Sequence, residues 1–514
     1  MDCTALAALA APGRPDMDNP QGGPDPANPG KSTAQFLSVF PKVALPMFLA
    51  LSDQSIVATA LPAIAGSLGS VEQISLVVIG YLIAATVAAP AYGRLGDAFG
   101  RRRLLLTALA IFMCATVFCS LAVNLPMLVI GRVLQGMGGG GLMALSQALI
   151  GETVAPRDRA KYQGYLAAVG VTSNALGPVL GGVLTELFGW RSIFYYSLPL
   201  CLLAFYMISR LPARARHSGS FKFDYQGLVL FAVFVFCVLF LLQRIQRFEL
   251  AHLPLILGLL AVAVISFVLL IKVEHRLASP LLPVDLLRNP TIWRANAMAA
   301  CHGGILVSLL TFVPIYLRVV HETSAGQTGL LLVPMTVGIG VGSIITGQIV
   351  SRTGRTAILP SWGLVFVALG LVTIAFLAPQ FRPVELSASL GLMALFLGTV
   401  MSVVQVTVQM AAGQAMLGAG AASVQYSRSM GAALGTAVVA AILFATLANA
   451  DPAAAHLFGE VLQHGTSALD ALSAERNETI QSEFAEAFRA AFLAIAGMAA
   501  IGAVFVWTLP LRRI

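Results

Sequence analysis

The stretch Gly93-Arg94-Leu95-Gly96-Asp97-Ala98-Phe99-Gly100-Arg101 lies between two long apolar runs. The second half of the chain carries a reduced copy of it, Gly347-Gln348-Ile349-Val350-Ser351-Arg352-Thr353-Gly354-Arg355. Both copies are short polar loops that follow a glycine-bearing apolar run. Their matching positions predict a duplicated architecture with one such loop in each half. The apolar runs on either side of each loop are the helices that would be repeated.

The composition of the chain is that of an integral membrane protein. Its 514 residues are 58% hydrophobic and 11% charged, with a mean hydropathy of +0.85. Soluble domains carry about 25% charged residues, and one hydrophobic core stops growing at about 250–300 residues. The surplus of apolar surface must therefore face lipid.

About fourteen apolar runs are long enough to cross a hydrocarbon core of about 30 Å as helices. We place them at Val43–Ile64, Ile74–Tyr92, Leu104–Val123, Met127–Ile150, Gly164–Leu184, Ile193–Ile208, Gly227–Leu242, Leu253–Ile271, Ala295–Leu317, Thr328–Val350, Ile358–Ala378, Leu386–Met410, Gly420–Leu447 and Ala487–Leu509.

The basic residues predict the orientation of these helices. With a cytoplasmic N-terminus, the inner side carries 22 Lys and Arg residues and the outer side carries 7. This is the positive-inside pattern, with both termini in the cytoplasm, and it accounts for the net charge of +8 without nucleic acid as a partner. The six cysteines form no CxxC pair, so neither a metal site nor a disulfide framework is expected, and no cofactor is indicated.

The runs divide into an all-α architecture of two six-helix bundles plus two extra helices. Parallel repeats of this kind are one way in which a midplane site forms between two halves. The expected segments are a disordered cytoplasmic tail (1–36), an N-terminal bundle (37–210), two inserted helices (224–272), a cytoplasmic linker (273–294), and a C-terminal bundle (295–514) with an outer helical hairpin (450–486).

Several motifs, in order along the chain, resemble those of the major facilitator superfamily, in its fourteen-helix drug/proton antiporter branch (the EmrB/QacA type). The segment Asp53-Gln54-Ser55-Ile56-Val57-Ala58-Thr59-Ala60-Leu61-Pro62 is similar to D-x-T-I-V-N-V-A-L-P and departs from it at Ala58. The stretch 93–103 resembles motif A, Arg132-Val133-Leu134-Gln135-Gly136 resembles motif B, and Gly177-Pro178-Val179-Leu180-Gly181-Gly182 resembles motif C, which is typical of exporters.

Asp53 and Arg132 are the candidate proton-coupling residues. A charge at the bilayer midplane costs about 2.5–3.5 kcal/mol on insertion scales, so such residues are functional by default. The rise of 1.5 Å per residue puts the two at depths that an arginine side chain can bridge. We expect Asp53 to carry the proton and Arg132 to control its release. The alternative is a static ion pair that only fixes helix packing.

The loop after the second run has a mechanical interpretation. Asp97 can accept hydrogen bonds from the positive start of a neighbouring helix, and Arg101 can pair with a carboxylate. With Gly93, Gly96 and Gly100 permitting close approach, the loop would hold the cytoplasmic side closed, which is also what the resemblance implies. The alternative, a basic loop that only sets topology, leaves the Gly and Asp spacing unexplained.

The motif in the fifth helix presents a face of small residues. Gly170, Asn174, Gly177 and Gly181 recur at helical spacing and permit a close helix contact, while Pro178 is expected to add a local break and Gly182 completes the motif. The direction of export follows only from the resemblance.

The remaining polar groups at membrane depth are candidates for lining a substrate cavity: Tyr81, Gln135, Asn174, Tyr316, Gln405, Gln409 and Arg428. Arg428 needs a partner, and donation to backbone carbonyls, an anionic substrate and a gating role are all open. His302 is interpreted as a satisfied packing residue, with a proton relay as the alternative. One acid and two arginines at midplane predict that dications are disfavoured.

The sequence therefore predicts a proton-coupled antiporter that exports hydrophobic or amphiphilic drugs by alternating access across the inner membrane. The alternatives are a proton-coupled uptake symporter for a small metabolite and a non-transporting lipid-binding or sensory membrane protein. An enzyme is not expected, because no loop pairs a nucleophile with a base. Small substrates, protons and the bilayer are the expected partners, and a periplasmic adaptor stays open.

Overall fold

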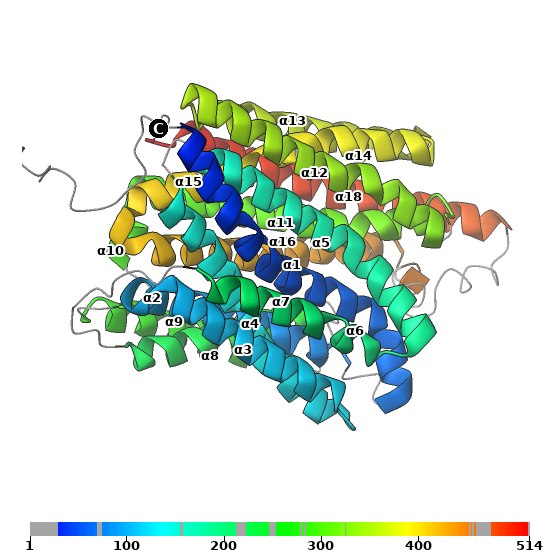
Figure 1. Cartoon of the computed structure of the whole chain (residues 1–514). Coiled ribbons are helices and arrows are strands. Elements are labelled where there is room, and N and C mark those ends of the chain that lie inside the picture. The colour runs from blue at the N-terminus through cyan, green and yellow to red at the C-terminus, as the bar shows by residue number, and fades with distance from the viewer. Residues whose placement is uncertain are drawn as a thin grey trace, which may run out of the picture.

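The structure is a computed structural model of the whole chain. It describes residues 29–68, 74–154, 158–211, 223–245, 253–277, 280–281, 284–323, 325–451, 454, 457–458 and 474–511. The elements of this part are helices, most of them long and running roughly along one common direction (Figure 1).

The N-terminal bundle is built from the first seven helices. They are α1 (Pro29–Leu68), α2 (Leu76–Phe99), α3 (Arg101–Ser120), α4 (Leu125–Thr153), α5 (Arg159–Phe188), α6 (Ser192–Tyr195) and α7 (Ser197–Ser209). Asn124 caps α4, because its side chain accepts a hydrogen bond from the Met127 amide at 2.9 Å. The sixth apolar run is interrupted at Tyr196, so it forms α6 and α7 instead of one helix.

The insert and the C-terminal bundle follow. The insert contains α8 (Tyr225–Ile245) and α9 (Leu253–Glu274), and α10 (Val284–Arg288) leads into the second bundle. That bundle contains α11 (Pro290–Val319), α12 (Ala325–Thr353), α13 (Ile358–Leu377), α14 (Pro383–Leu397), α15 (Thr399–Ala412), α16 (Leu417–Ala450) and α18 (Ala474–Trp507), with 3-10 turns η2 (Ala378–Gln380) and η3 (Gln414–Met416).

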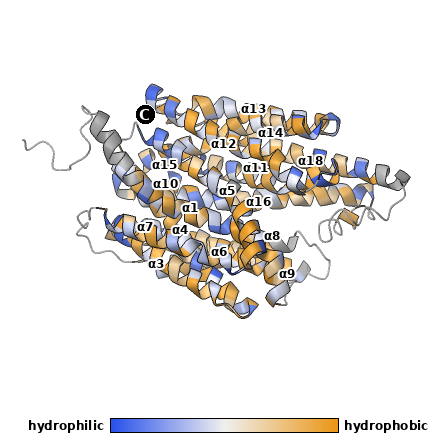
Figure 2. Ribbon diagram, turned by 45° about the vertical axis from the view of Figure 1, so that its right-hand side comes forward, coloured by the Kyte–Doolittle hydropathy of each residue, from blue (hydrophilic) through white to orange (hydrophobic). Residues whose placement is uncertain are grey.

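Thirteen helical stretches of the described residues are long and apolar enough to cross a membrane. Their hydrophobic residues follow the length of the helices, as the orange ribbons of Figure 2 show. The insert helix α8 is apolar but shorter over its described side chains, Tyr225–Leu241. The expected count of fourteen therefore stays a prediction, while a membrane-spanning all-α fold is what the structure has.

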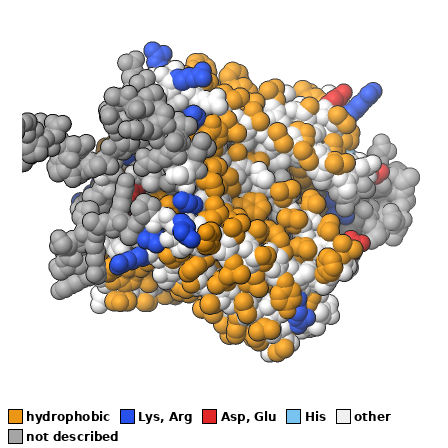
Figure 3. All heavy atoms as spheres, viewed as in Figure 1, with side chains coloured by type: hydrophobic (Ala, Val, Ile, Leu, Met, Phe, Trp, Pro, Cys, Tyr) orange, Lys and Arg blue, Asp and Glu red, His pale blue; other side chains and the backbone are white. Residues whose placement is uncertain are grey.

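The two ends of the molecule differ in charge. Blue Lys and Arg side chains gather mainly at the end that holds the C-terminus, and a broad orange belt separates this end from the other (Figure 3). Arg101, Arg102 and Arg103 directly follow the one-residue loop between α2 and α3, and Arg355 lies in the loop between α12 and α13. We call the end that holds these loops and the C-terminus the basic end, and the other end the opposite end.

Each bundle has its own apolar core, and the insert lies against both bundles. One core is made by α11–α18, and two smaller ones are made by α1–α7. Phe231 and Val235 of α8 form a separate cluster with Met430 of α16, against which Ile83 and Val87 of α2 pack. The extra helices thus cover the boundary between α2 and α16.

Further expectations about elements differ from the structure, and the twelfth apolar run is also divided, into α14 and α15 at Gly398. Helix α1 begins at Pro29, inside the stretch expected to be disordered, because proline suits the first helical position; residues 1–28 lie outside the described residues. Helix α5 runs unbroken through Pro178. The second arm of the expected hairpin is the start of α18, which is continuous from Ala474, and most of 452–473 lies outside the described residues.

Candidate functional site

Asp53 and Arg132 form a buried ion pair inside the N-terminal bundle. Nη1 of Arg132 on α4 donates to Oδ2 of Asp53 on α1 at 2.5 Å. The same nitrogen donates to the Gln135 side-chain oxygen at 2.6 Å, and the Gln135 amide donates to Oδ1 of Asp53 at 2.9 Å. Both carboxylate oxygens are therefore held by residues one turn apart on α4.

Two further helices complete this network. The Gln135 amide also donates to the Thr116 hydroxyl of α3 at 2.9 Å, and Nε of Arg132 donates to the Val77 carbonyl of α2 at 3.3 Å. The guanidinium lies 4.4 Å from the centre of the Tyr81 ring, a cation–π distance. One acid thus ties together α1, α2, α3 and α4.

The pair is sealed in this conformation. The exposed fraction of the side chain is 3% for Asp53 and 0% for Arg132. Removing one partner of a buried ion pair costs about 3–5 kcal/mol, because the other charge is left uncompensated. Any exchange of a proton at Asp53 therefore requires a movement that opens a path to water.

At the basic end, Asp97 joins the two bundles. Its carboxylate oxygens accept hydrogen bonds from the backbone amides of Gly418 at 3.0 Å and Ala419 at 3.1 Å, at the start of α16. A carboxylate there is stabilised by the positive end of the helix dipole. Arg101 donates to Asp97 at 2.6 Å and also pairs with Glu152 at the end of α4.

Glycine is required at two points of this contact. Gly100 has a φ of +92°, which lets the chain turn sharply between α2 and α3. A Cβ at Gly93 would lie 2.7 Å from the Gly418 carbonyl oxygen. Gly96 faces Leu145 inside its own bundle. Of the five residues expected to form a latch, Gly93, Asp97 and Arg101 therefore take part in this contact. Gly96 packs within its own bundle, and Gly100 makes the turn before α3.

The repeated loop in the second half shares only part of this geometry. Gly354 also ends its helix with a positive φ, +67°. Ser351 stands where the first copy has Asp97, so no carboxylate is available to cap a helix of the other bundle. The internal repeat holds for the turn and not for the latch.

Other contacts between the bundles also lie in the half of the helices nearer the basic end. A Cβ at Gly164 of α5 would lie 2.7 Å from the Ser343 carbonyl oxygen of α12, and the Gln409 amide donates to the Gln147 carbonyl at 3.1 Å. Toward the opposite end, the exposed fraction is 67% for Leu187 of α5 and 73% for Leu330 of α12. The basic end is closed in this conformation.

The motif of the fifth helix packs against the helix that carries Asp53. A Cβ at Gly177 would lie 2.7 Å from Cβ of Ser55, and one at Gly181 would lie 2.6 Å from the Ile56 carbonyl oxygen. Gly182 has open space around it, and both Gly182 and Pro178 are exposed. Only half of the motif therefore makes the close contact.

Most of the expected cavity residues do not face open space here. Tyr81 is buried and donates to the Ala50 carbonyl at 2.9 Å, and Gln135 belongs to the Asp53 network. The ring of Tyr316 is enclosed by two phenylalanines of α18, which makes it a core residue. Gln405 and Gln409 are also buried. Their helices turn these side chains toward neighbouring helices.

Asn174 and Arg428 are the two expected cavity residues that keep some exposure. Asn174 is exposed and Arg428 is half-buried. Within the described part of the chain, Arg428 has no hydrogen bond or ion pair, so donation to backbone carbonyls, one of the three alternatives left open for it, does not occur in this conformation. His302 also differs from expectation, since both of its ring nitrogens are buried without a hydrogen-bond partner.

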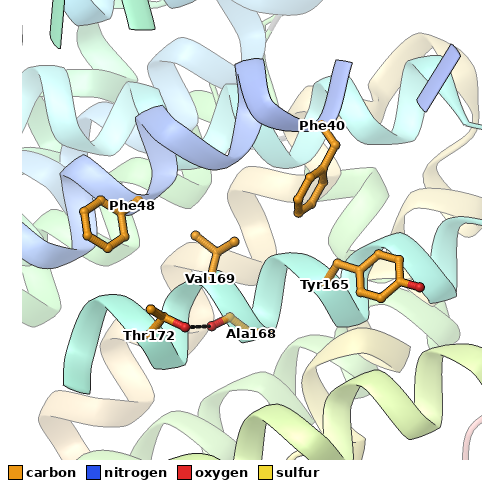
Figure 4. A pocket seen from close by; sticks show the side chains of 6 residues that line it. All are labelled: Phe40, Phe48, Tyr165, Ala168, Val169 and Thr172. Carbon is orange, nitrogen blue, oxygen red and sulfur yellow. Dashed lines mark hydrogen bonds between the residues drawn. The ribbon is translucent and has the colours of Figure 1, made fainter. Parts of the chain in front are cut away.

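An open apolar groove of about 320 Å³ lies between α1 and α5. Figure 4 shows Phe40 and Phe48 of α1 on one side and Tyr165, Ala168, Val169 and Thr172 of α5 on the other. The Thr172 hydroxyl donates to the Ala168 carbonyl at 2.9 Å, so the groove presents mainly apolar surface. None of the expected cavity residues lines this groove.

Sequence reasoning missed some partners of the residues it selected. Glu152, the Gly418 and Ala419 amides and Thr116 complete the two networks. Glu152 lies at the end of an apolar run, where an acid is easily taken for a boundary residue. No group of three His, Cys, Asp or Glu side chains that could hold a metal ion occurs among the residues placed by the structure.

Residues 43–436 match the family model of the Major Facilitator Superfamily. The chain belongs to the major facilitator superfamily. It is similar to the multidrug transporter protein MdtP of Bacillus subtilis, 30% identical over 78% of this chain and 74% of MdtP. It is also similar to an MFS-type transporter of Mycobacterium tuberculosis, 33% identical over 79% of this chain but only 59% of that relative's length.

Solved structures of the superfamily have the same fold. The human organic anion transporter MFSD10 superposes with a TM-score of 0.63 at 13% identity, over 91% of this chain and 99% of that one. The proton:xylose symporter XylE gives 0.61 at 15% identity, over 93% and 97%. At these identities the likeness shows the superfamily fold alone, and the chemistry rests on the residues of this chain.

Proposed function

We propose that this protein is a proton-coupled antiporter that exports hydrophobic or amphiphilic compounds from the cytoplasm. The observation that carries the proposal is the sealed network of Asp53, Arg132 and Gln135 at the centre of the N-terminal bundle. The names of relatives as multidrug transporters and efflux pumps support the substrate class. The basic end is taken as cytoplasmic, with both termini there.

The coupling follows from the ion pair. With the basic end closed, a movement that opens a path from the opposite end would bring water and a proton to Asp53, and the proton would remove its negative charge. Arg132 then keeps its hydrogen bonds to Gln135 and Val77 but loses its counter-ion, which favours a rearrangement of α1 against α4. Release of the proton on the cytoplasmic side restores the pair.

The packing of α5 on α1 transmits this rearrangement. Gly177 and Gly181 contact Ser55 and Ile56, which lie within one turn of Asp53. Because α5 also contacts α12 of the other bundle near Ser343, a shift of α1 reaches the boundary between the bundles. Each proton that moves down 100 mV supplies about 2.3 kcal/mol, and each pH unit supplies about 1.36 kcal/mol.

The test is ethidium transport by purified protein in proteoliposomes with an imposed pH gradient. The native chain should move ethidium against the proton flow, and Asp53→Asn should reduce this transport at least tenfold. Exchange of ethidium without a gradient should persist in Asp53→Asn, because exchange needs no net proton transfer. Full gradient-driven transport by Asp53→Asn would refute the assignment, and ethidium moving with the protons would favour the symporter alternative.

A further inference from the structure

The C-terminal bundle holds a cation, Arg428, that forms no ion pair with any residue described by the structure. Between Pro290 and Ala450 the chain has two acids, Glu322 after α11 and Glu385 in the first turn of α14, and both belong to the opposite end. In the N-terminal bundle, Asp53 already forms an ion pair with Arg132. Arg428 lies about a third of the way along α16, and among the residues that the structure describes we find no carboxylate at its depth.

The packing of α16 fixes the direction that Arg428 faces. Successive residues of an α-helix are about 100° apart. Tyr426 and Met430, two positions before and after it, contact α8 of the insert, so Arg428 lies on the far side from the insert. Gly431 contacts the Ala300 backbone of α11, and the Gln425 amide lies 3.8 Å from the Met143 sulfur of α4.

These two contacts bracket Arg428. Gly431 lies about 60° to one side of it around the helix and Gln425 about 60° to the other. Arg428 therefore points between α11 of its own bundle and α4 of the other bundle, which is the region between the two halves. It does not point toward lipid or into the core of one bundle.

A guanidinium at this depth requires a negative partner, because an isolated charge in the membrane interior is costly. Arginine matches a carboxylate in charge and in its planar, two-pronged geometry. The described residues supply no such partner, and we therefore look for it in a bound ligand.

We propose that Arg428 binds the carboxylate of an anionic amphiphile that the protein exports. This inference rests on the proposed function, because it names a substrate class for the cavity between the halves. It adds a site for anionic compounds to the expectation from charge counting, which stated only that dications are disfavoured. The apolar part of the ligand would lie against the surrounding side chains.

An unpartnered side chain on α11 supports this site. His302 lies one residue before Gly303, against which the Arg428 backbone carbonyl packs, and both of its ring nitrogens are buried without a hydrogen-bond partner. Buried polar groups are rarely left unsatisfied, so we assign the His302 ring to positioning the ligand in its bound state.

The test compares one charged and one neutral probe. Full-length protein in nanodiscs of zwitterionic phosphatidylcholine is titrated with a dansyl-labelled fatty carboxylate and with its methyl ester, and the signal of empty nanodiscs is subtracted. The native chain should bind the carboxylate at least tenfold more tightly than the ester. Arg428→Gln should bring the two affinities within about threefold by weakening only the carboxylate, and Arg428→Lys should retain part of the preference.

Arg318→Gln is the matched control, since Arg318 is an exposed arginine at the end of α11 in the same bundle. It should keep the native preference. Equal binding of both probes by the native chain, or equal weakening of both by Arg428→Gln, would overturn the proposal. Loss of the native preference when the nanodiscs contain anionic phosphatidylglycerol would assign the site to a lipid headgroup instead, which also overturns it.

Ethidium transport separates this inference from the proposed function. If the native chain fails to transport ethidium against the proton flow, the antiport proposal fails while the ratio of the two affinities still decides the role of Arg428.

Discussion

Asp53 shows how few residues are needed to make a charge in the membrane tolerable. Both of its carboxylate oxygens are occupied, one by Arg132 and one by Gln135, and the Gln135 amide is anchored by Thr116. The cost of burial is offset only while all of these groups stay in place. The network is therefore sensitive to the loss of any single member.

A double-mutant cycle measures the ion pair directly. Arg132→Ala should lower the free energy of unfolding by about 3–5 kcal/mol, because it leaves the buried carboxylate without its counter-ion. The double variant Asp53→Ala with Arg132→Ala should be more stable than Arg132→Ala alone. Thermal unfolding in detergent is the measurement, and a double variant with the summed loss of both single variants would show that the pair is not coupled.

The stability of the opposite end should depend on pH through His321. Burial lowers the pKa of His321 below its ordinary value of 6.5, and a hydrogen bond with the Ala378 backbone opposes this shift. The unfolded chain then binds the proton more readily than the folded one, so stability is complete above about pH 6.5 and falls as the pH drops below it.

His321→Gln should therefore reduce the loss of melting temperature between pH 7.5 and pH 5. The ring of His321 lies 5.3 Å from that of Tyr316, so the variant also loses a ring contact at both pH values. The decisive quantity is the difference in melting temperature between pH 7.5 and pH 5. An unchanged difference would exclude His321 as a contributor.

The residues of the Asp53–Arg132 ion pair could be selected from sequence because depth in the membrane follows from counting residues along each helix. The rise per residue brought Asp53 and Arg132 within reach, and the structure puts them in contact. Counting residues did not show in which direction around the helix axis each side chain faces. Tyr316 is polar at membrane depth, yet its position against Phe488 and Phe492 makes it part of a core.

At the scale of the elements, small residues decide which helices touch. Gly140 of α4 lies against the Ala85 backbone of α2, and Gly138 lies against Phe112 of α3. Close approach of this kind is what small residues provide in membranes, where no hydrophobic force brings helices together. The glycine run of α4 therefore positions the helix that carries Arg132.

Adjacent glycines of α5 offer a matched test. In Gly181→Ala the new Cβ would lie 2.6 Å from the Ile56 carbonyl oxygen, while in Gly182→Ala it meets nothing within 4 Å. Gly181→Ala should reduce transport and the melting temperature. Gly182→Ala should be neutral or should stabilise the helix by about 0.5–1 kcal/mol, the usual gain over glycine.

Melting curves and ethidium transport of the two variants, measured side by side, decide this prediction. Equal effects of both substitutions would mean that the contact between α5 and α1 is not what the motif provides. An effect of Gly182→Ala alone would point to an exposed role for the motif.

Helix existence was predictable and helix ends were not. Each expected apolar run corresponds to helical residues, because about twenty apolar residues in lipid must satisfy their backbone groups internally. The extension of α18 back to Ala474 is polar and was expected to be a separate arm. The interruption at Tyr196 and the continuity through Pro178 likewise depend on neighbouring helices.

At the scale of the whole molecule, the insert connects the bundles. The Phe231 ring of α8 lies 5.0 Å from the Tyr426 ring of α16, and the cluster around Phe231 includes residues of α2. Movement of the bundles relative to each other must therefore slide α8 along at least one of them. The internal repeat predicted the two halves, but no pattern in the sequence indicated where the insert lies.

Chemical cross-linking tests this arrangement. In a background without the native cysteines, Phe231→Cys with Tyr426→Cys joined by a short bifunctional reagent should reduce ethidium transport at least tenfold. The control pair is Phe234→Cys with Phe267→Cys, whose rings lie 5.2 Å apart within the insert. Cross-linking the control pair should leave transport intact, and full transport by both cross-linked proteins would show that α8 does not move relative to α16.

The contact of Asp97 with α16 joins a side chain on one helix to the main chain of the other, so substitutions on the two helices have different effects. Its acceptor groups belong to one side chain, whereas its donors are main-chain amides of Gly418 and Ala419. Substituting either of those two residues, except by proline, leaves the amides in place. Substitution of Asp97 can therefore remove the electrostatic part of this contact. Substitutions of Gly418 or Ala419 can weaken the contact only by adding a larger side chain that pushes the helices apart.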